Sequence, residues 1–330
     1  MLGHGVINGV DFDNVTEKGV DTILSKQRIK KIIIASMIAD ACGVPVESMK
    51  RGTFQVTGMT GGGTYDQPAG SWSDDSSLTL CLMDNLVTGG SLADLFQKMI
   101  AYMMNGRYTP SGQLFDIGNA TRKAVFNFAK GRPPLKCGDQ SIYANGNGAL
   151  MRIAPLAMTL LDEANSAVRI QTIVQYTQMT HAHNISIVGS ILYVELLRAL
   201  LGGADLRSAL EPLYQKVAEM PAYAKDSRQY KHLADPNFDQ QPISAVKSTG
   251  YVVDSLEAAV WVNEQAKTYQ EVVLTAVNLD DDTDTIAQLA AFMFACSHEM
   301  IDIPADWQQT LVMTAEARQI MTAFAEKFGE

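Results

Sequence analysis

The 330-residue chain contains only four cysteines, and no two of them form a Cys-x-x-Cys pair. Each lies in or near an apolar stretch, and they are scattered along the chain at Cys42, Cys81, Cys137 and Cys296. Such spacing offers neither a thiolate zinc site nor a disulfide framework, and it is typical of free, buried thiols in a reducing compartment. We therefore expect a cytoplasmic protein.

Positive charge and long apolar runs are also scarce. The 26 lysines and arginines stand against 36 aspartates and glutamates, which gives a formal net charge of −10. Neither nucleic acid nor an anionic membrane attracts such a chain, so neither is expected as a partner. The N-terminal segment is broken up by Asp11, Asp13, Glu17 and Lys18, and no later run reaches transmembrane length without polar residues. We expect no signal peptide and no membrane span.

The sequence has no Gly-x-Ser-x-Gly elbow, Walker loop or Gly-x-Gly-x-x-Gly fingerprint, and it shows no convincing period-two alternation. Apolar residues instead recur with helical spacing from Arg28 onward, and the expected helices include residues 149–161, 283–299 and 306–327. With 47% hydrophobic residues, the chain can bury a large core as one big domain or as two closely packed ones. We therefore expect an all-α fold.

Two polar stretches interrupt the helical pattern. Residues 1–27 are weakly patterned, and we expect them to form an N-terminal arm or a small added element before a helical domain over residues 28–330. Residues 225–250 hold many charged residues and two prolines, which predicts a solvated connection.

Two short acidic clusters are the most informative feature of the chain. Ser73-Asp74-Asp75-Ser76 and Asp280–Thr285 each open into an apolar helical run, and residues 286–296 are apolar on nearly every side, which predicts a central helix. One acid at a helix start is explained by capping. Four acids within five positions are more than capping requires. Unpaired carboxylates beside a buried helix repel one another, so they either take up protons or bind a cation. Solvated aspartates on a multiply capped helix are the alternative.

Oxygen-only ligands favour magnesium, manganese or calcium. Glu47 follows a buried helix and could lie over such a site, although a lone loop glutamate is more often solvated. His181 and His183 have no third histidine or cysteine nearby in sequence, and a hydrogen-bonded packing role is expected for them.

Glycines mark two candidate phosphate-binding segments. Residues 52–73 form a long glycine-rich loop, and Gly146-Asn147-Gly148 stands at an expected helix start, where exposed amides can hold a phosphate. A tight turn explains these glycines equally well, and Arg152 could be a structural partner.

Taken together, these segments resemble the ADP-ribosylglycohydrolase family over roughly residues 28–300. The resemblance rests on five ordered blocks: Ala39–Glu47, Trp72–Ser76, Gly146–Pro155, Ser248–Ala259 and Asp282–Thr285. It implies a compact, single-domain orthogonal helical bundle around a binuclear site that holds two Mg²⁺ or Mn²⁺ ions.

The resemblance also implies roles for individual residues. The metal ligands would be Ser73, Asp74, Asp75, Asp282, Asp284 and Thr285. A carboxylate, Glu47, Asp75 or Asp282, would handle the proton, with Glu47 at the entrance. The substrate diphosphate would be held by Gly61, Gly62, Gly63, Asn147, Gly148 and Ala149.

Two departures from the family pattern stand in these blocks. Serine replaces the usual threonine at Ser73 and Ser76, and Asp280 and Asp281 replace the glycines that usually precede the final Asp-x-Asp-Thr. Aspartate adopts a positive φ less readily than glycine does, so the backbone conformation at Asp280 and Asp281 is an open question.

The expected function is that of a metal-dependent hydrolase, which cleaves the N- or O-glycosidic bond between ADP-ribose and an acceptor and so reverses ADP-ribosylation. The expected partner is a protein or small molecule that bears ADP-ribose, and the protein is expected to be a monomer. A catalytically silent ADP-ribose-binding protein, or an immunity protein that contacts a toxin through residues 1–27, is the alternative. A two-metal phosphohydrolase is a third.

Overall fold

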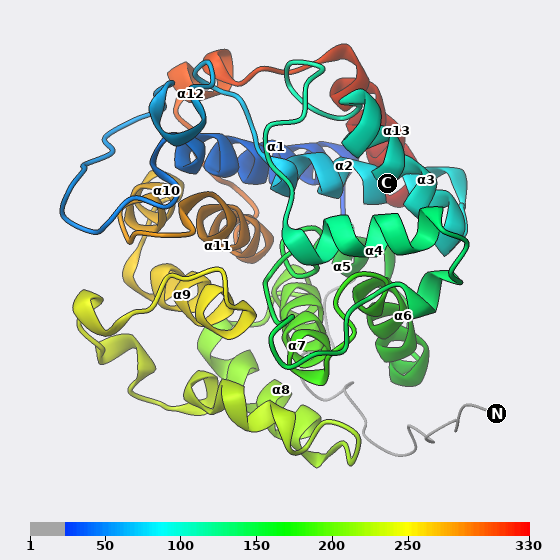
Figure 1. Cartoon of the computed structure of the whole chain (residues 1–330). Coiled ribbons are helices and arrows are strands. Elements are labelled where there is room, and N and C mark those ends of the chain that lie inside the picture. Colours follow the sequence, from blue (N-terminus) through cyan, green and yellow to red (C-terminus); the bar gives the residue numbers. More distant parts are fainter. Residues whose placement is uncertain (1–23) are drawn as a thin grey trace.

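Thirteen α-helices and no β-strand make up residues 24–330, the part of the chain that the computed structural model describes (Figure 1). The helices are α1 (Lys26–Gly43), α2 (Asp74–Thr88), α3 (Leu92–Asn105), α4 (Asn119–Ala129), α5 (Pro155–Thr159), α6 (Ser166–Gln178), α7 (Asn184–Leu201), α8 (Leu206–Glu219), α9 (Val252–Gln265), α10 (Tyr269–Val277), α11 (Thr283–Ser297), α12 (Ala305–Thr310) and α13 (Ala315–Phe328). The 3-10 turns are η2 (Val44–Val46), η3 (Gly63–Tyr65), η4 (Pro134–Lys136), η5 (Asp226–Ala234), η6 (Phe238–Gln240) and η7 (Ile243–Ala245). The predicted all-α fold is confirmed.

The core is built around α11. Every residue of this helix from Thr283 to Cys296 is buried, and it contacts α1, α7, α9 and α10. Figure 1 shows α11 in the middle of the molecule, below α1 and above α9. A helix that is apolar on every side has no polar face for solvent, so it is buried at the centre of the fold, as its sequence predicted.

The long helix α7 is the second buried element. By length and composition it could cross a membrane, alone among the helices of residues 24–330, but 89% of it is buried inside the fold. It contacts α5, α6, α8, α9 and α11, as the core helix of a globular protein does. The four cysteines are free and buried, as expected.

Helix α1 begins inside the segment predicted as an arm. Its first residue is Lys26, because the Ser25 hydroxyl caps it by accepting from the Arg28 N–H at 3.1 Å. Residues 1–23 of the predicted arm lie outside the described residues, so the domain boundary at residue 28 stays a prediction.

Two of the predicted helices are wrong. Residues 149–154 form turns, and only Pro155–Thr159 of the predicted helix 149–161 is helical. The predicted helix 306–327 is broken into α12 and α13, because the Val312 N–H turns away to donate to Gly70 O at 3.0 Å and Thr314 caps a new helix. A tertiary hydrogen bond therefore overrides apolar spacing at Val312, while residues 149–154 form local turns closed by bonds such as Met151 N–H to Asn147 O at 3.0 Å.

The polar segment 225–250 is more than a solvated connection. Tyr230, Leu233 and Phe238 are buried, and the Tyr230 hydroxyl donates to Ile185 O at 2.8 Å. The indole N–H of Trp261 on α9 donates to Gln241 O at 3.1 Å. The segment is therefore fixed against α7 and α9.

Candidate metal centre

The first acidic cluster is built on the start of α2. Ser73 is the N-cap, and its Oγ accepts from the Asp75 N–H at 3.2 Å. Asp40, buried inside α1, accepts from the Ser73 N–H and the Ser76 N–H at 3.0 Å each and from the Ser76 hydroxyl at 2.5 Å. Asp74 is 5% exposed and Asp75 is 2% exposed. The carboxylates of the first cluster are thus buried at a helix start that Asp40 fixes from below.

The second acidic cluster lies at the start of α11, directly against the end of α1. The Thr283 hydroxyl donates to Gly43 O at 2.9 Å. A Cβ atom on Gly43 would lie 2.4 Å from the Asp284 Cα, so only glycine permits this approach. Asp284 and Thr285 are buried in the first turn of the helix, and Asp282 stands at its N-cap position.

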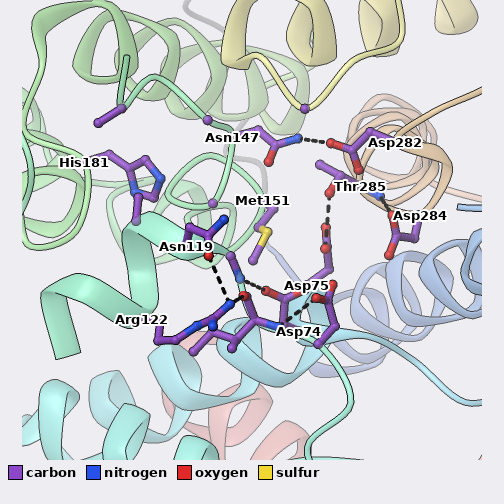
Figure 2. Close-up of a pocket in the computed structure, with 18 of the residues that line it drawn as sticks. Asp74, Asp75, Asn119, Arg122, Asn147, Met151, His181, Asp282, Asp284 and Thr285 are labelled. Carbon is purple, nitrogen blue, oxygen red and sulfur yellow. Dashed lines mark hydrogen bonds between the residues drawn. The ribbon is translucent and has the colours of Figure 1, made fainter. Parts of the chain in front are cut away.

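The two clusters meet, although they are far apart in the sequence. Thr285 Oγ1 donates to Asp75 Oδ2 at 3.2 Å across a sequence separation of 210 residues. Carboxylate oxygens of Glu47, Asp282 and Asp284 lie within 4.8 Å of one another. Figure 2 shows Asp74 and Asp75 on α2 facing Asp282, Asp284 and Thr285. The structure therefore brings five of the six predicted ligands and Glu47 to one cavity of about 450 Å³, while Ser73 lies beneath as the cap of α2.

The electrostatics of the cavity favour a cation. Burial, with repulsion from neighbouring carboxylates, raises the pKa of Asp74, Asp75 and Asp284 well above the usual range. Burial likewise raises the pKa of Asp282, and it raises that of Glu47 to about 8. Such groups either hold protons or require a positive charge between them.

The donor set fits a hard divalent cation. It consists of carboxylate and hydroxyl oxygens, which magnesium, manganese and calcium prefer. Glu47 Oε2 is buried without a hydrogen-bond partner, which leaves it available. Arg122, the arginine that lines the cavity, donates to Ile117 O at 3.2 Å and to Asn119 Oδ1 at 3.1 Å.

The segment around Asn147 does not start a helix, so that prediction is wrong. The Asn147 N–H donates to Gly250 O at 3.0 Å, while its side-chain amide donates to Asp282 Oδ2 at 2.5 Å and to Ser255 Oγ at 2.9 Å. Asn147 and Gly148 line the cavity, whereas Ala149 is buried and is not part of its wall. Asn147 thus orients Asp282, a contact that the sequence did not suggest.

The predicted glycines Gly61, Gly62 and Gly63 are not among the residues that line the cavity. A Cβ atom on Gly63 would lie 1.8 Å from Pro45 O, so the loop packs against η2. The neighbouring Thr64 hydroxyl donates to Glu47 O at 2.6 Å. The glycine loop therefore contacts the backbone that carries Glu47.

Several cavity residues were missed by the sequence reasoning. Asp116 and Gly118 precede α4, and the Gly118 N–H donates to Asp74 Oδ2 at 3.2 Å. Tyr143 lines the cavity and is 96% exposed. No local pattern marks these loop residues. Asp40 had a signal that was not used, since a lone acid inside an apolar helix needs a partner.

His181 forms part of the cavity wall, beyond the packing role predicted for it (Figure 2). The Arg152 guanidinium donates to Thr180 Oγ1 at 2.9 Å, and Thr180 Oγ1 lies 2.9 Å from His181 Nδ1. The hydroxyl of Thr180 thus links the imidazole of His181 to the Arg152 guanidinium. Burial and the Arg152 charge lower the pKa of His181 to about 3, so it stays neutral. His183 instead caps α7.

Comparisons with known proteins agree on one family. The model of the ADP-ribosylglycohydrolase family matches residues 21–330. The ADP-ribosylarginine hydrolase Tri1 of Pseudomonas putida (strain GB-1) is 28% identical over 295 residues, which cover 89% of this chain and 76% of the relative. The ADP-ribosyl-dinitrogen reductase glycohydrolase of Rhodospirillum rubrum is 25% identical over 289 residues, which cover 84% of this chain and 88% of the relative.

A solved structure has the same fold. The chain is similar to an ADP-ribosylglycohydrolase-related protein complex with a TM-score of 0.75 and 25% sequence identity. The match covers 91% of this chain and 96% of the solved chain. The all-helical arrangement is thus shared along nearly the whole length of both.

Proposed function

The chain belongs to the ADP-ribosylglycohydrolase family, and on this premise we propose that it is a metal-dependent hydrolase that removes ADP-ribose from arginine side chains of proteins. That it is a hydrolase of ADP-ribosyl groups follows from the family and from its named relatives. The choice of arginine is supported by the Tri1 relatives from Pseudomonas putida and Serratia proteamaculans, both of which are named ADP-ribosylarginine hydrolases.

One observation carries the metal dependence. Carboxylates from two helix starts converge on one cavity, and burial raises the pKa of each of them. We propose that two Mg²⁺ or Mn²⁺ ions would be held by Asp74, Asp75, Asp282, Asp284 and Thr285. Ser73, the sixth predicted ligand, would support them from beneath as the cap of α2. When bound, such ions polarise ribose hydroxyls and lower the pKa of water.

The remaining chemistry is assigned to protein groups. Hydrolysis adds water at the anomeric carbon of the ribose, breaks the bond from that carbon to the guanidine nitrogen and returns a proton to the leaving guanidine. Glu47, Asp75 or Asp282 would move that proton, because each is a carboxylate in the cavity wall. Among these, Glu47 has a pKa raised to about 8, so without metal it can carry a proton near neutral pH.

Other cavity residues suit substrate binding. The neutral imidazole of His181 and the side chain of Asn147 both lie on the cavity wall (Figure 2). A cavity of about 450 Å³ falls within the range of small-molecule sites, about 300–1,000 Å³. Binding of the diphosphate by Gly148 is part of the proposal, while Gly61 to Gly63 would act on substrate only through the Glu47 loop.

The test is the release of free ADP-ribose, measured by chromatography after metal has been stripped from the protein. Proteins ADP-ribosylated on arginine or on serine serve as substrates, with no metal, Mg²⁺ or Mn²⁺ added. We expect release from the arginine substrate only when metal is present, and none from Asp74→Ala. Release from the serine substrate alone would overturn the choice of arginine as the acceptor. Binding of ADP-ribose without any release would favour a silent binding protein.

A further inference from the structure

The backbone just before Asp282 has a conformation that L-amino acids rarely adopt. Asp280 has φ +152° and Asp281 has φ +56°, both in the region that favours glycine. Aspartate tolerates this region better than most residues, but two in succession need support from outside the segment. The next residue, Asp282, is a member of the carboxylate cluster, so its position depends on whatever supplies that support.

Arg51 supplies it. Its guanidinium donates to Leu279 O at 2.5 Å, to Val246 O at 2.9 Å and to Ile243 O. It also pairs with Asp280 Oδ1 at 3.0 Å. One side chain thus ties the segment before α11 to the end of the polar segment 225–250.

The hydrogen bonds from Arg51 to backbone carbonyls hold the segment more than its ion pair with Asp280 does. The Arg51 and Asp280 side chains are 26% and 32% exposed, and a partly exposed ion pair contributes little by itself. A planar guanidinium holds several acceptors in fixed directions at once, which an ammonium group cannot do. The Ser248 hydroxyl donates to the same oxygen, Asp280 Oδ1.

Backbone hydrogen bonds tie the loop of Glu47 to the same segment. The Ser48 N–H donates to Asp281 O at 2.6 Å, and the Asp281 N–H donates to Met49 O at 3.1 Å. The loop that carries Glu47 and Arg51 and the loop that carries Asp282 are therefore joined by two backbone hydrogen bonds. The Asp282 N–H in turn donates to Ser248 O at 3.0 Å.

We propose that Arg51 is a positioning residue of the metal centre: by holding Asp280 and Asp281 at positive φ, it sets the separation of Glu47 and Asp282. The proposal rests on the proposed function, because it takes these two carboxylates to serve the metal. Arg51 itself does not line the cavity.

The experiment measures Mn²⁺ binding to metal-stripped protein by titration calorimetry. We expect Arg51→Ala to weaken Mn²⁺ binding about tenfold. Arg51→Lys should weaken it nearly as much, because lysine keeps the charge but lacks the several fixed donors of the planar guanidinium. The double variant Arg51→Ala/Asp280→Gly should recover to within about threefold of wild type, because glycine adopts the required φ unaided.

Arg207→Ala is the matched control. Arg207 likewise joins separate segments, by pairing with Asp239 at 3.3 Å and with Glu264 at 3.0 Å, and its side chain is 34% exposed. It does not line the cavity. This variant should bind Mn²⁺ like wild type. Equal weakening by Arg207→Ala and Arg51→Ala would overturn the proposal, as would wild-type affinity in Arg51→Ala.

A second readout does not need the metal. Amide hydrogen exchange over residues 279–283 of the metal-free protein should speed up in Arg51→Ala and not in Arg207→Ala. If wild type binds no Mn²⁺, the proposed metal dependence fails, while unchanged exchange would refute the role of Arg51 separately. If Arg51→Ala does not fold, the double variant decides, since failure of glycine to restore folding and binding contradicts the proposal.

Discussion

The two acidic clusters reach one cavity by different means. The first is fixed by regular helix geometry: Ser73 caps α2, and the buried Asp40 accepts three hydrogen bonds from residues 73 and 76. The second stands on two consecutive residues with positive φ, and it is fixed by Arg51 and by the absence of a side chain at Gly43. The first cluster therefore rests on a regular helix start and on one acid 33 to 36 residues away, while the second rests on an unfavourable loop conformation and on an arginine 229 residues away.

The difference shows where each half of the site is vulnerable. A helix start survives small shifts elsewhere because its own hydrogen bonds define it. A loop with unfavourable φ angles keeps its shape only while its neighbours hold it. Changes in the surroundings should therefore affect Asp282 and Asp284 more readily than Asp74 and Asp75.

The largest effect should come from removing one carboxylate of either cluster. We expect Asp74→Asn and Asp284→Asn each to lower metal-dependent release of ADP-ribose by about 1,000-fold or more, because both clusters would hold the same ions. The exposed Asp302→Asn is the matched control and should be neutral. Initial rates at saturating Mn²⁺ provide the measurement. Full activity in either site variant would mean that the two clusters do not hold the same ions.

Next in size is the loss of the support beneath the first cluster. Asp40→Ala leaves the N–H groups of Ser73 and Ser76 and the Ser76 hydroxyl buried without an acceptor. We expect the free energy of unfolding to fall by about 3 kcal/mol, since each buried, unsatisfied donor costs about 1–3 kcal/mol. Urea denaturation measures this. A variant as stable as wild type would mean that the cluster does not depend on Asp40.

A smaller effect should follow from crowding the second cluster. Gly43→Ala places a methyl group against the Asp284 backbone, so α1 and α11 must separate. We expect a loss of about 1–3 kcal/mol of stability together with weaker Mn²⁺ binding. Gly131→Ala is the control, because Gly131 has φ +88° but open space around it. It should lose some stability and no metal affinity; equal affinities in both variants would count against the close approach.

The smallest effect concerns pH in the metal-free protein. Burial raises the pKa of Glu47 from 4.5 to about 8, so between these values the folded state binds more protons than the unfolded state. Wild-type stability should therefore fall as pH rises through this window, and Glu47→Gln should lack that contribution. Urea unfolding of both proteins in a chelator gives the comparison. The advantage of Glu47→Gln should grow up to about pH 8, whereas a constant gap contradicts the assignment.

Helical periodicity predicted most of the fold, and it failed at residues 149–154 and at the junction of α12 and α13. Helix α11 begins at Thr283, where its apolar spacing predicted, and ends at Ser297, two residues before the predicted end. Residues 149–154 are mostly apolar but form turns. The helix predicted over residues 306–327 ends early because the Val312 N–H donates to Gly70 O. The apolar pattern of a sequence does not reveal a hydrogen-bond partner as distant as Gly70.

The site shows the same limit. The carboxylates of both clusters could be predicted because four acids in five positions exceed what capping requires. Asp116, Tyr143 and His181 lie on loops or at a helix end, and only the fold brings them to the cavity. The conformation of Asp280 and Asp281 could not be predicted either, since the arginine that holds them is more than two hundred residues away in the sequence.

The most direct test is anomalous diffraction at the manganese edge from crystals of the protein soaked in Mn²⁺. We predict two manganese peaks within bonding distance of oxygens from both clusters, with Asp74 or Asp75 on one side and Asp282 or Asp284 on the other. A manganese-dependent enzyme whose ions lie elsewhere, or touch one cluster alone, would contradict the claim that the two clusters form one metal centre.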